Sequence, residues 1–220
     1  MDSKRTELTG HELGKIQRKQ KILDAARDII NDSGRATISM RAIAEAAGVS
    51  PATPYNLFGS KKEIMHQLFN QNLQEYMVRV EELAHGDALL AIFETLRLAR
   101  EMYEADTTFF KSVLSLLFQA EQQDLKYSFT QPRYYFFRKL IEKAMQQGSL
   151  LQDTPSDLCA NACVHIFLST VLSWVNDEVS FDELERDVIF GFGAILLGFS
   201  SRNRRQTILE KMKVAEANLS

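Results

Sequence analysis

The sequence predicts an all-α protein, with a small helical domain near its N-terminus and a larger helical part after it. Apolar residues recur at spacings of three and four in each long segment, and no stretch alternates as a strand would. Glycine, proline or a capping residue separates these segments. The chain has 220 residues, 45% of them hydrophobic, which is enough for one large domain or two small ones.

The first periodic segment predicts a supporting helix. Ile22, Leu23, Ala26 and Ile30 share one face, and Gly34 ends the pattern. Residues 1–15 before it are polar throughout, so we expect a flexible arm there.

Residues 39–58 predict two short helices joined by a tight turn. Ser39 is placed to cap the first helix, and Gly48 supplies the positive φ with which helices often end. Ser50 is placed as the next N-cap, with Pro51 at the first helical position. Pro54 would then be the fourth helical residue, where it removes the first intrahelical hydrogen bond, so we expect a distorted first turn.

These residues carry a resemblance to a known family. The N-terminal region resembles the DNA-binding domain of the TetR family of bacterial transcriptional regulators, densely over residues 16–68. The matching residues are Ile22, Ala25, Ala26, Gly34, Ser39, Ile43, Ala44, Ala47, Gly48, Val49, Ser50, Tyr55, Phe58, Ser60, Lys61 and Glu63. A helical hairpin that never touches DNA is the alternative, because a cap, a glycine and an apolar stripe occur in any such hairpin.

The resemblance implies roles for individual residues of this domain. Tyr55 and Lys61 match residues that bind DNA phosphates, and Ser39 and Arg41 can add contacts at the start of their helix. Base recognition would fall to the short second helix. The predicted DNA-binding set is Ser39, Arg41, Ser50, Ala52, Thr53, Tyr55, Asn56 and Lys61. Cations of the arm and the following turns, Lys4, Arg5, Lys15, Arg18 and Lys19, fit either a solvated tail or a further DNA contact.

Charge is divided unequally along the chain. Residues 1–66 carry a net charge of +3, whereas the remainder carries −6. A weakly basic domain on an acidic body directs phosphates to one part of the molecule. Because the excess is small, tight binding would depend on a few well-placed groups and on two copies of the domain.

The rest of the chain, residues 69–220, is expected to hold an effector and to dimerise. Ser60 caps a long helix that runs to about Leu83, and the later helices are expected at about 88–105, 108–122, 132–147, 156–176, 181–200 and 203–217. Residues 157–175 and 183–199 are apolar on most sides, which fits burial inside the subunit or against a second copy. In the TetR family such helices pair in a four-helix interface. We therefore predict a homodimer through Cys163, Phe167, Val171, Phe190, Gly191, Ala194, Leu197 and Gly198, which would read a pseudo-palindromic operator in double-stranded DNA.

Aromatic residues gather in the same part of the chain, and most should be core. A mostly apolar cavity with a few polar groups would bind a small lipophilic or aromatic effector that releases a repressor from DNA. The candidate lining is Phe93, Phe110, Phe118, Gln122, Tyr134, Phe137, His165, Ser169 and Trp174. The alternative is a DNA-associated adaptor of the same fold with no small effector.

Other classes of function find little support. No phosphate-binding loop, nucleophile motif, zinc motif or dinucleotide fingerprint occurs, so we expect no catalytic residue, cofactor or metal. Cys159 and Cys163 lie one helical turn apart, a pattern that fits core packing better than a metal or redox site. No apolar run approaches about 18 residues and the start of the chain lacks a secretion signal, so we expect no membrane partner and a cytoplasmic protein.

Overall fold

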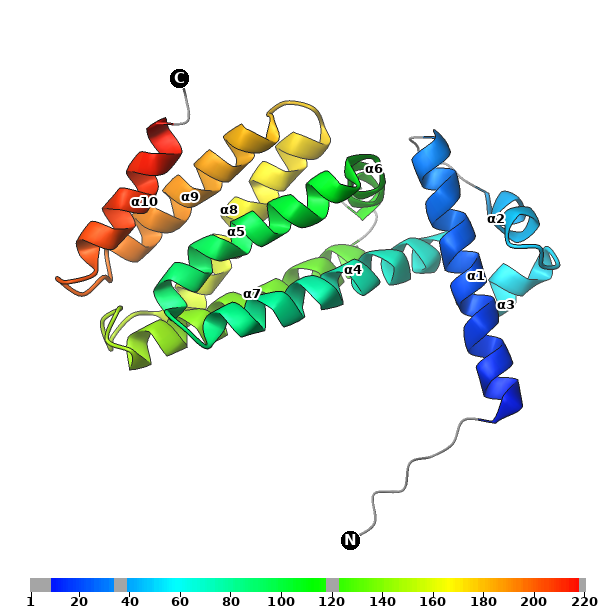
Figure 1. The fold of residues 1–220 in the computed structure, drawn as a ribbon, viewed down its shortest axis with the longest axis horizontal. Coiled ribbons are helices and arrows are strands. Elements are labelled where there is room, and N and C mark those ends of the chain that lie inside the picture. The colour runs from blue at the N-terminus through cyan, green and yellow to red at the C-terminus, as the bar shows by residue number, and fades with distance from the viewer. Residues whose placement is uncertain (1–8, 34–38, 118–122, 218–220) are drawn as a thin grey trace, which may run out of the picture. The chain divides into compact units, whose positions relative to one another are not determined.

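The computed structural model of the chain describes residues 9–33, 39–117 and 123–217. Within these ranges the structure is helical, with one isolated bridge between Leu150 and Ser200, so the predicted all-α fold is confirmed. The chain divides into two compact units, Met1–Gln71 and Asn72–Ser220 (Figure 1). The boundary between the two units falls inside a long helix, after Gln71.

The first unit contains α1 (Gly10–Ser33), α2 (Met40–Ala46), α3 (Ala52–Phe58) and the beginning of α4 (Lys61–Ala84). Helix α1 packs on both α2 and α3. Its apolar face is buried as the sequence predicts, with Ile22 and Ile30 fully inaccessible, and Ile43 and Phe58 complete this small core.

Helix α1 begins earlier than the sequence predicted, because Gly10–Lys15 are helical where a flexible arm was expected. Thr9 and Glu12 explain the early start. The Glu12 amide donates to the Thr9 hydroxyl oxygen at 3.3 Å, and the Glu12 carboxylate accepts from the Thr9 amide at 2.8 Å. This reciprocal pair is a capping box, whose four-residue pattern is present in the sequence.

The second unit contains the remainder of α4 and six further helices. They are α5 (Ala88–Ala105), α6 (Thr107–Leu117), α7 (Gln123–Gln146), α8 (Ser156–Val175), α9 (Phe181–Leu197) and α10 (Arg205–Ala217). Helix α8 is central, since it packs on α6, α7 and α9, while α9 also packs on α5 and α10. The core is rich in aromatic rings. Tyr103 stacks on Trp174 with ring centroids 5.5 Å apart, and Phe137 meets Phe192 edge to face at 5.2 Å.

Helix α7 continues through Pro132, where the sequence predicted a break. A proline inside a helix leaves the carbonyl one turn earlier without its amide donor. Side chains bond to neighbouring carbonyls instead: Arg133 Nη1 donates to the Phe129 carbonyl at 2.9 Å, and Thr130 Oγ1 donates to the Tyr127 carbonyl at 3.2 Å. Tertiary packing and these bonds therefore keep the helix intact across the proline.

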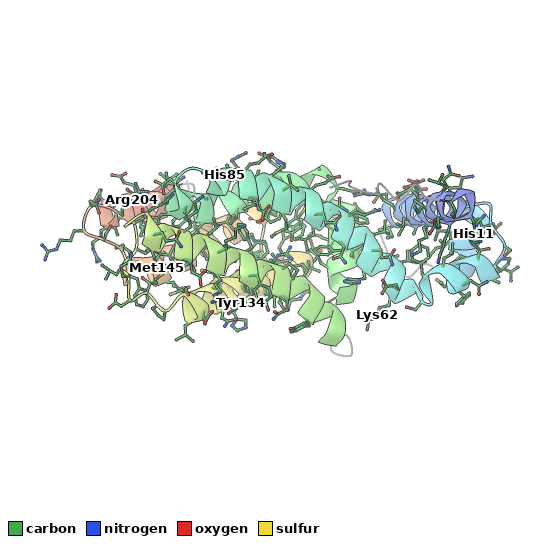
Figure 2. All side chains as sticks on the ribbon, turned by 90° about the horizontal axis from the view of Figure 1, so that it is seen from below. His11, Lys62, His85, Tyr134, Met145 and Arg204 are labelled. Atoms are coloured by element: carbon green, nitrogen blue, oxygen red, sulfur yellow. The ribbon has the colours of Figure 1, made fainter. Side chains whose placement is uncertain are left out.

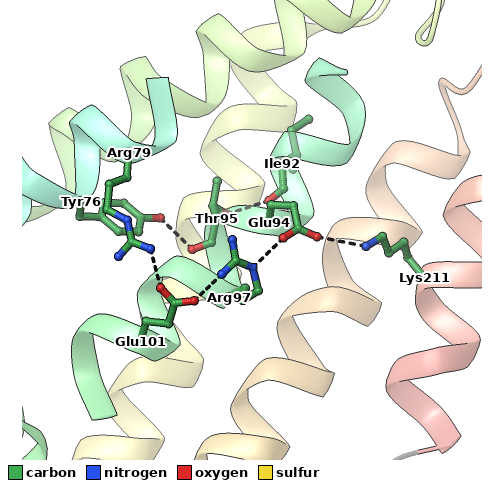
Figure 3. Close-up of polar contacts among 8 residues, drawn as sticks. All are labelled: Tyr76, Arg79, Ile92, Glu94, Thr95, Arg97, Glu101 and Lys211. Atoms are coloured by element: carbon green, nitrogen blue, oxygen red, sulfur yellow. Dashed lines mark hydrogen bonds and ion pairs between the residues drawn. The ribbon is translucent and has the colours of Figure 1, made fainter. Parts of the chain in front are cut away.

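A chain of ion pairs joins three helices of the second unit (Figure 3). Glu101 of α5 pairs with Arg79 of α4 and with Arg97 of its own helix. Arg97 also pairs with Glu94 at 2.9 Å, and Glu94 accepts from Lys211 of α10 at 3.2 Å. These charges are partly exposed, so each pair contributes little by itself, but together they fix α10 and α4 to the same side of α5.

Helix α8 is apolar along most of its length. By length and composition alone it is apolar enough to cross a membrane, with a mean hydropathy of 1.7 over its most apolar window. In the structure 44% of that window is buried inside the protein, where α8 packs against its neighbouring helices.

Candidate nucleic-acid interface

Helix α2 and the turn after it are formed by local hydrogen bonds. The Ser39 hydroxyl accepts from the Ala42 amide at 3.1 Å, as the sequence predicts for an N-cap. At the other end the Val49 amide donates to the Ala44 carbonyl and the Gly48 amide to the Glu45 carbonyl. This is a Schellman motif, and Gly48 occupies its left-handed position with φ of 63°. The sharp turn between α2 and α3 is therefore encoded by these few residues.

Helix α3 begins one residue later than predicted. Pro51 precedes it as the N-cap residue and no side chain caps its amides, so the expectation that Ser50 is the N-cap is wrong. The Ser50 hydroxyl instead lies 2.8 Å from the Thr53 hydroxyl, and the Ser50 carbonyl accepts from the Thr53 amide at 2.9 Å.

Pro54 explains this shift of the start of α3. With Ala52 as the first helical residue, Pro54 is the third, and its missing amide would have had no intrahelical partner there. The Ser50 carbonyl, which cannot accept from residue 54, accepts from residue 53 in a tighter turn. The predicted distortion is thus confined to the beginning of the helix, and the buried Pro54 ring packs inward with Phe58.

Most of the predicted DNA-binding residues lie on the surface of the first unit. Ser39, Arg41, Ser50, Ala52 and Asn56 are exposed, and Tyr55 exposes 56% of its surface. Thr53 and Lys61 are half-buried. Because the inward side of α3 carries Pro54 and Phe58, its outward side presents a phenol, an amide and a small methyl group. A surface of this kind can bond phosphates and base edges, and the individual contacts stay predictions.

Ser60 and Lys19 position the end of α3. The Ser60 hydroxyl accepts from the Glu63 amide at 3.2 Å, so Ser60 caps α4 as predicted. The Lys19 ammonium lies over the Phe58 ring, 5.3 Å from its centroid, which fixes α1 against the last residue of α3.

The predicted dimer residues separate into two groups in the second unit. Phe190, Ala194 and Gly198 are exposed, and Gly191 and Leu197 are half-buried. Cys163, Phe167 and Val171 instead face the core of their own subunit, where each is at most 4% exposed. These three side chains are covered within one chain and do not form part of the outer surface of α8.

The outer surface of α8 carries other residues. Leu158, His165, Ser169 and Leu172 recur there at helical spacing and are exposed. A Cβ at Gly191 would lie 2.9 Å from Ile166 Cδ1, so α8 and α9 approach closely at this point. Ile166 and Gly191 are both half-buried, so this contact lies near the protein surface. We call the surface residues of the two helices on this side the α8–α9 outer face, and they are Leu158, His165, Ser169, Leu172, Phe190, Ala194, Leu197 and Gly198.

Those predicted effector-pocket residues that the structure describes do not together line either of the two cavities beside α9 and α10. His165 and Ser169 point outward, contrary to the prediction, because the inward side of α8 is occupied by apolar residues such as Cys163 and Phe167. Tyr134 lies on the surface of α7, where its hydroxyl donates to Asp157 at 2.7 Å (Figure 2). Four others, Phe93, Phe110, Phe137 and Trp174, are buried, and Phe118 and Gln122 lie outside the described residues.

Two cavities involve α9 and α10. The larger, of about 450 Å³, is lined by apolar Phe190, Leu209 and Met212 together with charged residues at its rim. A smaller one of about 210 Å³ adjoins α5 and includes Phe93. The sequence did not predict the larger cavity, because its lining comes from two helices whose facing sides periodicity alone does not pair.

Sequence reasoning also missed a buried cation. Arg133 is only 3% exposed, with its guanidinium 3.8 Å from the Phe129 ring centroid and Nη2 3.5 Å from the Tyr103 hydroxyl. Burial raises the pKa of Tyr103, although the nearby guanidinium opposes that shift. The signal for this site was a single basic residue in the aromatic segment QPRYYFF.

Both cysteines are free and buried. Burial raises the pKa of the Cys159 and Cys163 thiols, so both stay protonated at neutral pH. Among the described residues, no three His, Cys, Asp or Glu side chains come together in a way that could hold a metal ion.

Residues 22–68, which cover most of the first unit, match the family model described as bacterial regulatory proteins, tetR family. Over these residues the chain is similar to the TetR family of bacterial regulators. A relative from Bacillus subtilis strain 168, the uncharacterized HTH-type transcriptional regulator YhgD, is 23% identical over 192 residues, which are 80% of this chain and 92% of YhgD.

Solved structures of similar fold cover both units. SmeT, the repressor of the Stenotrophomonas maltophilia multidrug efflux pump SmeDEF, aligns with a TM-score of 0.67 at 17% identity, over 84% of this chain and 92% of SmeT. RolR, solved in complex with resorcinol, aligns with a TM-score of 0.65 at 13% identity, over 92% of this chain and 95% of RolR. The chain therefore shares the fold of these regulators over both units.

Proposed function

We propose that this protein is a sequence-specific DNA-binding regulator that inserts α3 into the major groove. The observation that carries the proposal is the α2–α3 pair, whose capped helices and Gly48 turn leave Tyr55 and Asn56 exposed on a basic first unit. In helix-turn-helix proteins the second helix of such a pair contacts base edges while the first crosses the backbone.

Roles within this surface follow from side-chain chemistry. Tyr55 and Lys61 would bind phosphates, with Ser39 and Arg41 adding contacts near the start of α2. Asn56 can bond adenine through its amide, and Ala52 and the Thr53 methyl can meet a thymine methyl group. Because the first turn of α3 is tightened before Pro54, Tyr55 and Asn56 follow regular helical geometry more closely than Thr53 does.

We further propose that two copies bind one operator. The α8–α9 outer face exposes Leu158 by 69%, Phe190 by 60% and Leu172 by 39%, which is a costly surface to leave in water. Pairing of these helices with those of a second copy would bury it in a four-helix interface. Two identical heads then require a pseudo-palindromic site with half-sites about 34–36 Å apart.

The protein would act as a repressor that a small effector releases, in the bacterial cytoplasm. SmeT is a repressor and RolR was solved with an aromatic ligand, which supports this form of regulation. The cavity of about 450 Å³ between α9 and α10 lies within the size range of small-molecule sites. A specific observation favours the alternative, an adaptor without a small effector: the aromatic residues predicted to line a pocket, such as Phe110 and Trp174, pack on Tyr103.

Selection of bound duplexes from a randomised pool by the full-length protein tests the proposal. We expect an enriched sequence with two-fold symmetry, and we expect Tyr55→Phe and Asn56→Ala to weaken binding to it. Tyr135→Phe is the matched control, because Tyr135 is 60% exposed on α7 of the second unit. If no duplex is enriched at low salt, the protein is not a sequence-specific DNA-binding regulator.

The effector is tested separately on the selected duplex. A panel of phenolic and lipophilic compounds that includes resorcinol is added to the complex, and release is followed by fluorescence anisotropy. Release by a subset of compounds supports the repressor, and binding that no compound changes supports the adaptor.

A further inference from the structure

The first three turns of α1 extend beyond the core of the first unit. No residue from Gly10 to Lys21 is buried, whereas Ile22 and Leu23 are. Figure 1 shows this end of α1 continuing past α3 within the same unit. The segment stays helical because it continues a longer helix and because Thr9 and Glu12 cap it.

The face that α1 turns toward α2 and α3 changes character in this extension. Ile22, Ala26 and Ile30 form the buried stripe, and the same stripe continues toward the N-terminus at residues spaced by three and four. It carries His11, Glu12, Lys15, Arg18 and Lys19, three permanent cations and one carboxylate. The apolar packing face thus becomes a cationic face where the core ends.

The position of this cationic face is fixed by Lys19. Its ammonium lies 5.3 Å from the ring centroid of Phe58, the last residue of α3. From Phe58 the chain passes through Gly59 and Ser60 to Lys61, a predicted phosphate ligand. The extension therefore lies beside the end of the reading helix.

These cations differ from those of the second unit in their partners. Arg97, Arg100 and Lys211 are each paired with carboxylates of neighbouring helices. Lys15 and Arg18 are exposed, and within the described ranges neither has an ion pair. The nearby acids bond to neutral groups, since Glu12 caps the helix and Asp24 accepts from Gln20 at 2.8 Å. The face thus carries more positive than negative charge.

We propose that Lys15 and Arg18 form a second DNA contact, which binds backbone phosphates next to the segment contacted by α3. The inference rests on the proposed function, because the same unit must present α3 to DNA. A lysine and an arginine on a helix surface bind phosphates without reading bases. This contact therefore adds affinity for any sequence, and it offsets the small net charge of the first unit.

The test compares two full-length double variants on the duplex that the wild-type protein selects. Lys15→Gln/Arg18→Gln removes the proposed contact, and glutamine keeps the helix propensity. Lys139→Gln/Arg202→Gln is the matched control: it removes the same charge, one lysine and one arginine, from the second unit, where both side chains are exposed. Dissociation constants are measured by fluorescence anisotropy over a range of potassium chloride concentrations.

Loss of two phosphate contacts in each of the two copies, four in all, should lower the slope of log affinity against log salt by about 3.6, which weakens binding roughly four-thousandfold at 0.1 M salt. A scrambled duplex should show the same change in slope, and the control should stay near wild type. The inference would be overturned by an unchanged slope or by an equal loss of affinity in the control. It would also be overturned if the double variant changed its oligomeric state while its salt dependence stayed that of the wild type. If the wild-type protein selects no duplex, the proposed function fails first, and the two failures are thereby distinguished.

Discussion

Replacement of Gly48 by alanine tests how the turn between α2 and α3 is stabilised. Gly48 has φ of 63°, and a Cβ built on it would meet nothing within 4 Å. The effect of the substitution is therefore conformational, with no contribution from packing. An alanine in the left-handed conformation destabilises the folded state by about 1–2 kcal/mol. Alanine also lowers the conformational entropy of the unfolded chain, which offsets about 0.4–1 kcal/mol of that loss. We expect Gly48→Ala to destabilise the first unit by about 1 kcal/mol.

Gly14 provides a control of opposite sign in the same unit. It lies inside α1, and a Cβ there would meet only the Arg18 guanidinium, at 3.7 Å. Because alanine is a better helix former than glycine by about 1 kcal/mol, Gly14→Ala should stabilise α1 by a similar amount. Gly48→Asn should cost less than Gly48→Ala, since asparagine enters the left-handed region more easily.

Native-state hydrogen exchange read on peptides of α1 and α2 measures these changes locally. A change of about 1 kcal/mol corresponds to roughly fivefold in exchange rate, faster for Gly48→Ala and slower for Gly14→Ala. The reasoning would be refuted if Gly48→Ala and Gly14→Ala changed the exchange rate in the same direction. It would also be refuted by a Gly48→Asn protein that is less stable than Gly48→Ala.

Three further predictions concern the second unit. Phe190→Glu should convert a dimer into monomers in light scattering, because a carboxylate on the α8–α9 outer face opposes burial, whereas Tyr135→Glu should leave the mass unchanged. The Ser180 amide and hydroxyl donate to the Glu183 carboxylate and lower its pKa. The stability that this pair contributes is therefore fully present above the pKa of a glutamate in the unfolded chain, about 4.3, and it is lost as the pH falls through the lower pKa of the folded protein. Glu183→Gln should therefore reduce the loss of unfolding free energy at acid pH, measured by urea denaturation over a pH series, and an unchanged pH dependence would show that this pair contributes nothing. Cys159 and Cys163 should react with a thiol reagent at neutral pH only after unfolding, since burial raises both pKa values, and rapid labelling of the native protein would contradict their placement in the core.

Local sequence signals predicted the helix boundaries wherever short-range hydrogen bonds decide them. Ser39, Gly48 and Ser60 act as the sequence suggested. The early start of α1 was also readable from Thr9 and Glu12, although the polar composition around them suggested an arm. In each case the deciding contact lies within five residues along the chain.

The effect of a proline was harder to predict. It depends on how far the proline lies from the start of its helix, and the sequence does not determine that start to within one residue. Moving the start of α3 by one residue makes Pro54 tolerable. Pro132 is tolerated for a different reason, since other helices pack on α7 and side chains bond to carbonyls next to the one that the proline leaves without a donor. Local propensity predicted a break there, and tertiary packing overrode it.

The two faces of α8 could not be told apart from sequence. The helix is apolar on most sides, so periodicity does not show which side its own subunit covers. The prediction placed Cys163, Phe167 and Val171 outside, and it placed His165 and Ser169 in a pocket; the structure reverses both. Only the packing of α6, α7 and α9 around α8 distinguishes these faces.

The ion pairs that attach α10 also determine when the second unit can be completed during synthesis. Lys211 pairs with Glu94 and Arg204 pairs with Asp87, and each pair joins residues 117 positions apart. Helix α5 therefore leaves the ribosome long before its C-terminal partners exist. Until then Asp87 and Glu94 lack these cations, and the side of α9 that α10 covers stays open to other chains. The contacts of the first unit join residues that lie close together in the sequence, so they can form soon after synthesis. We therefore expect the first unit to fold while the remainder is still being translated.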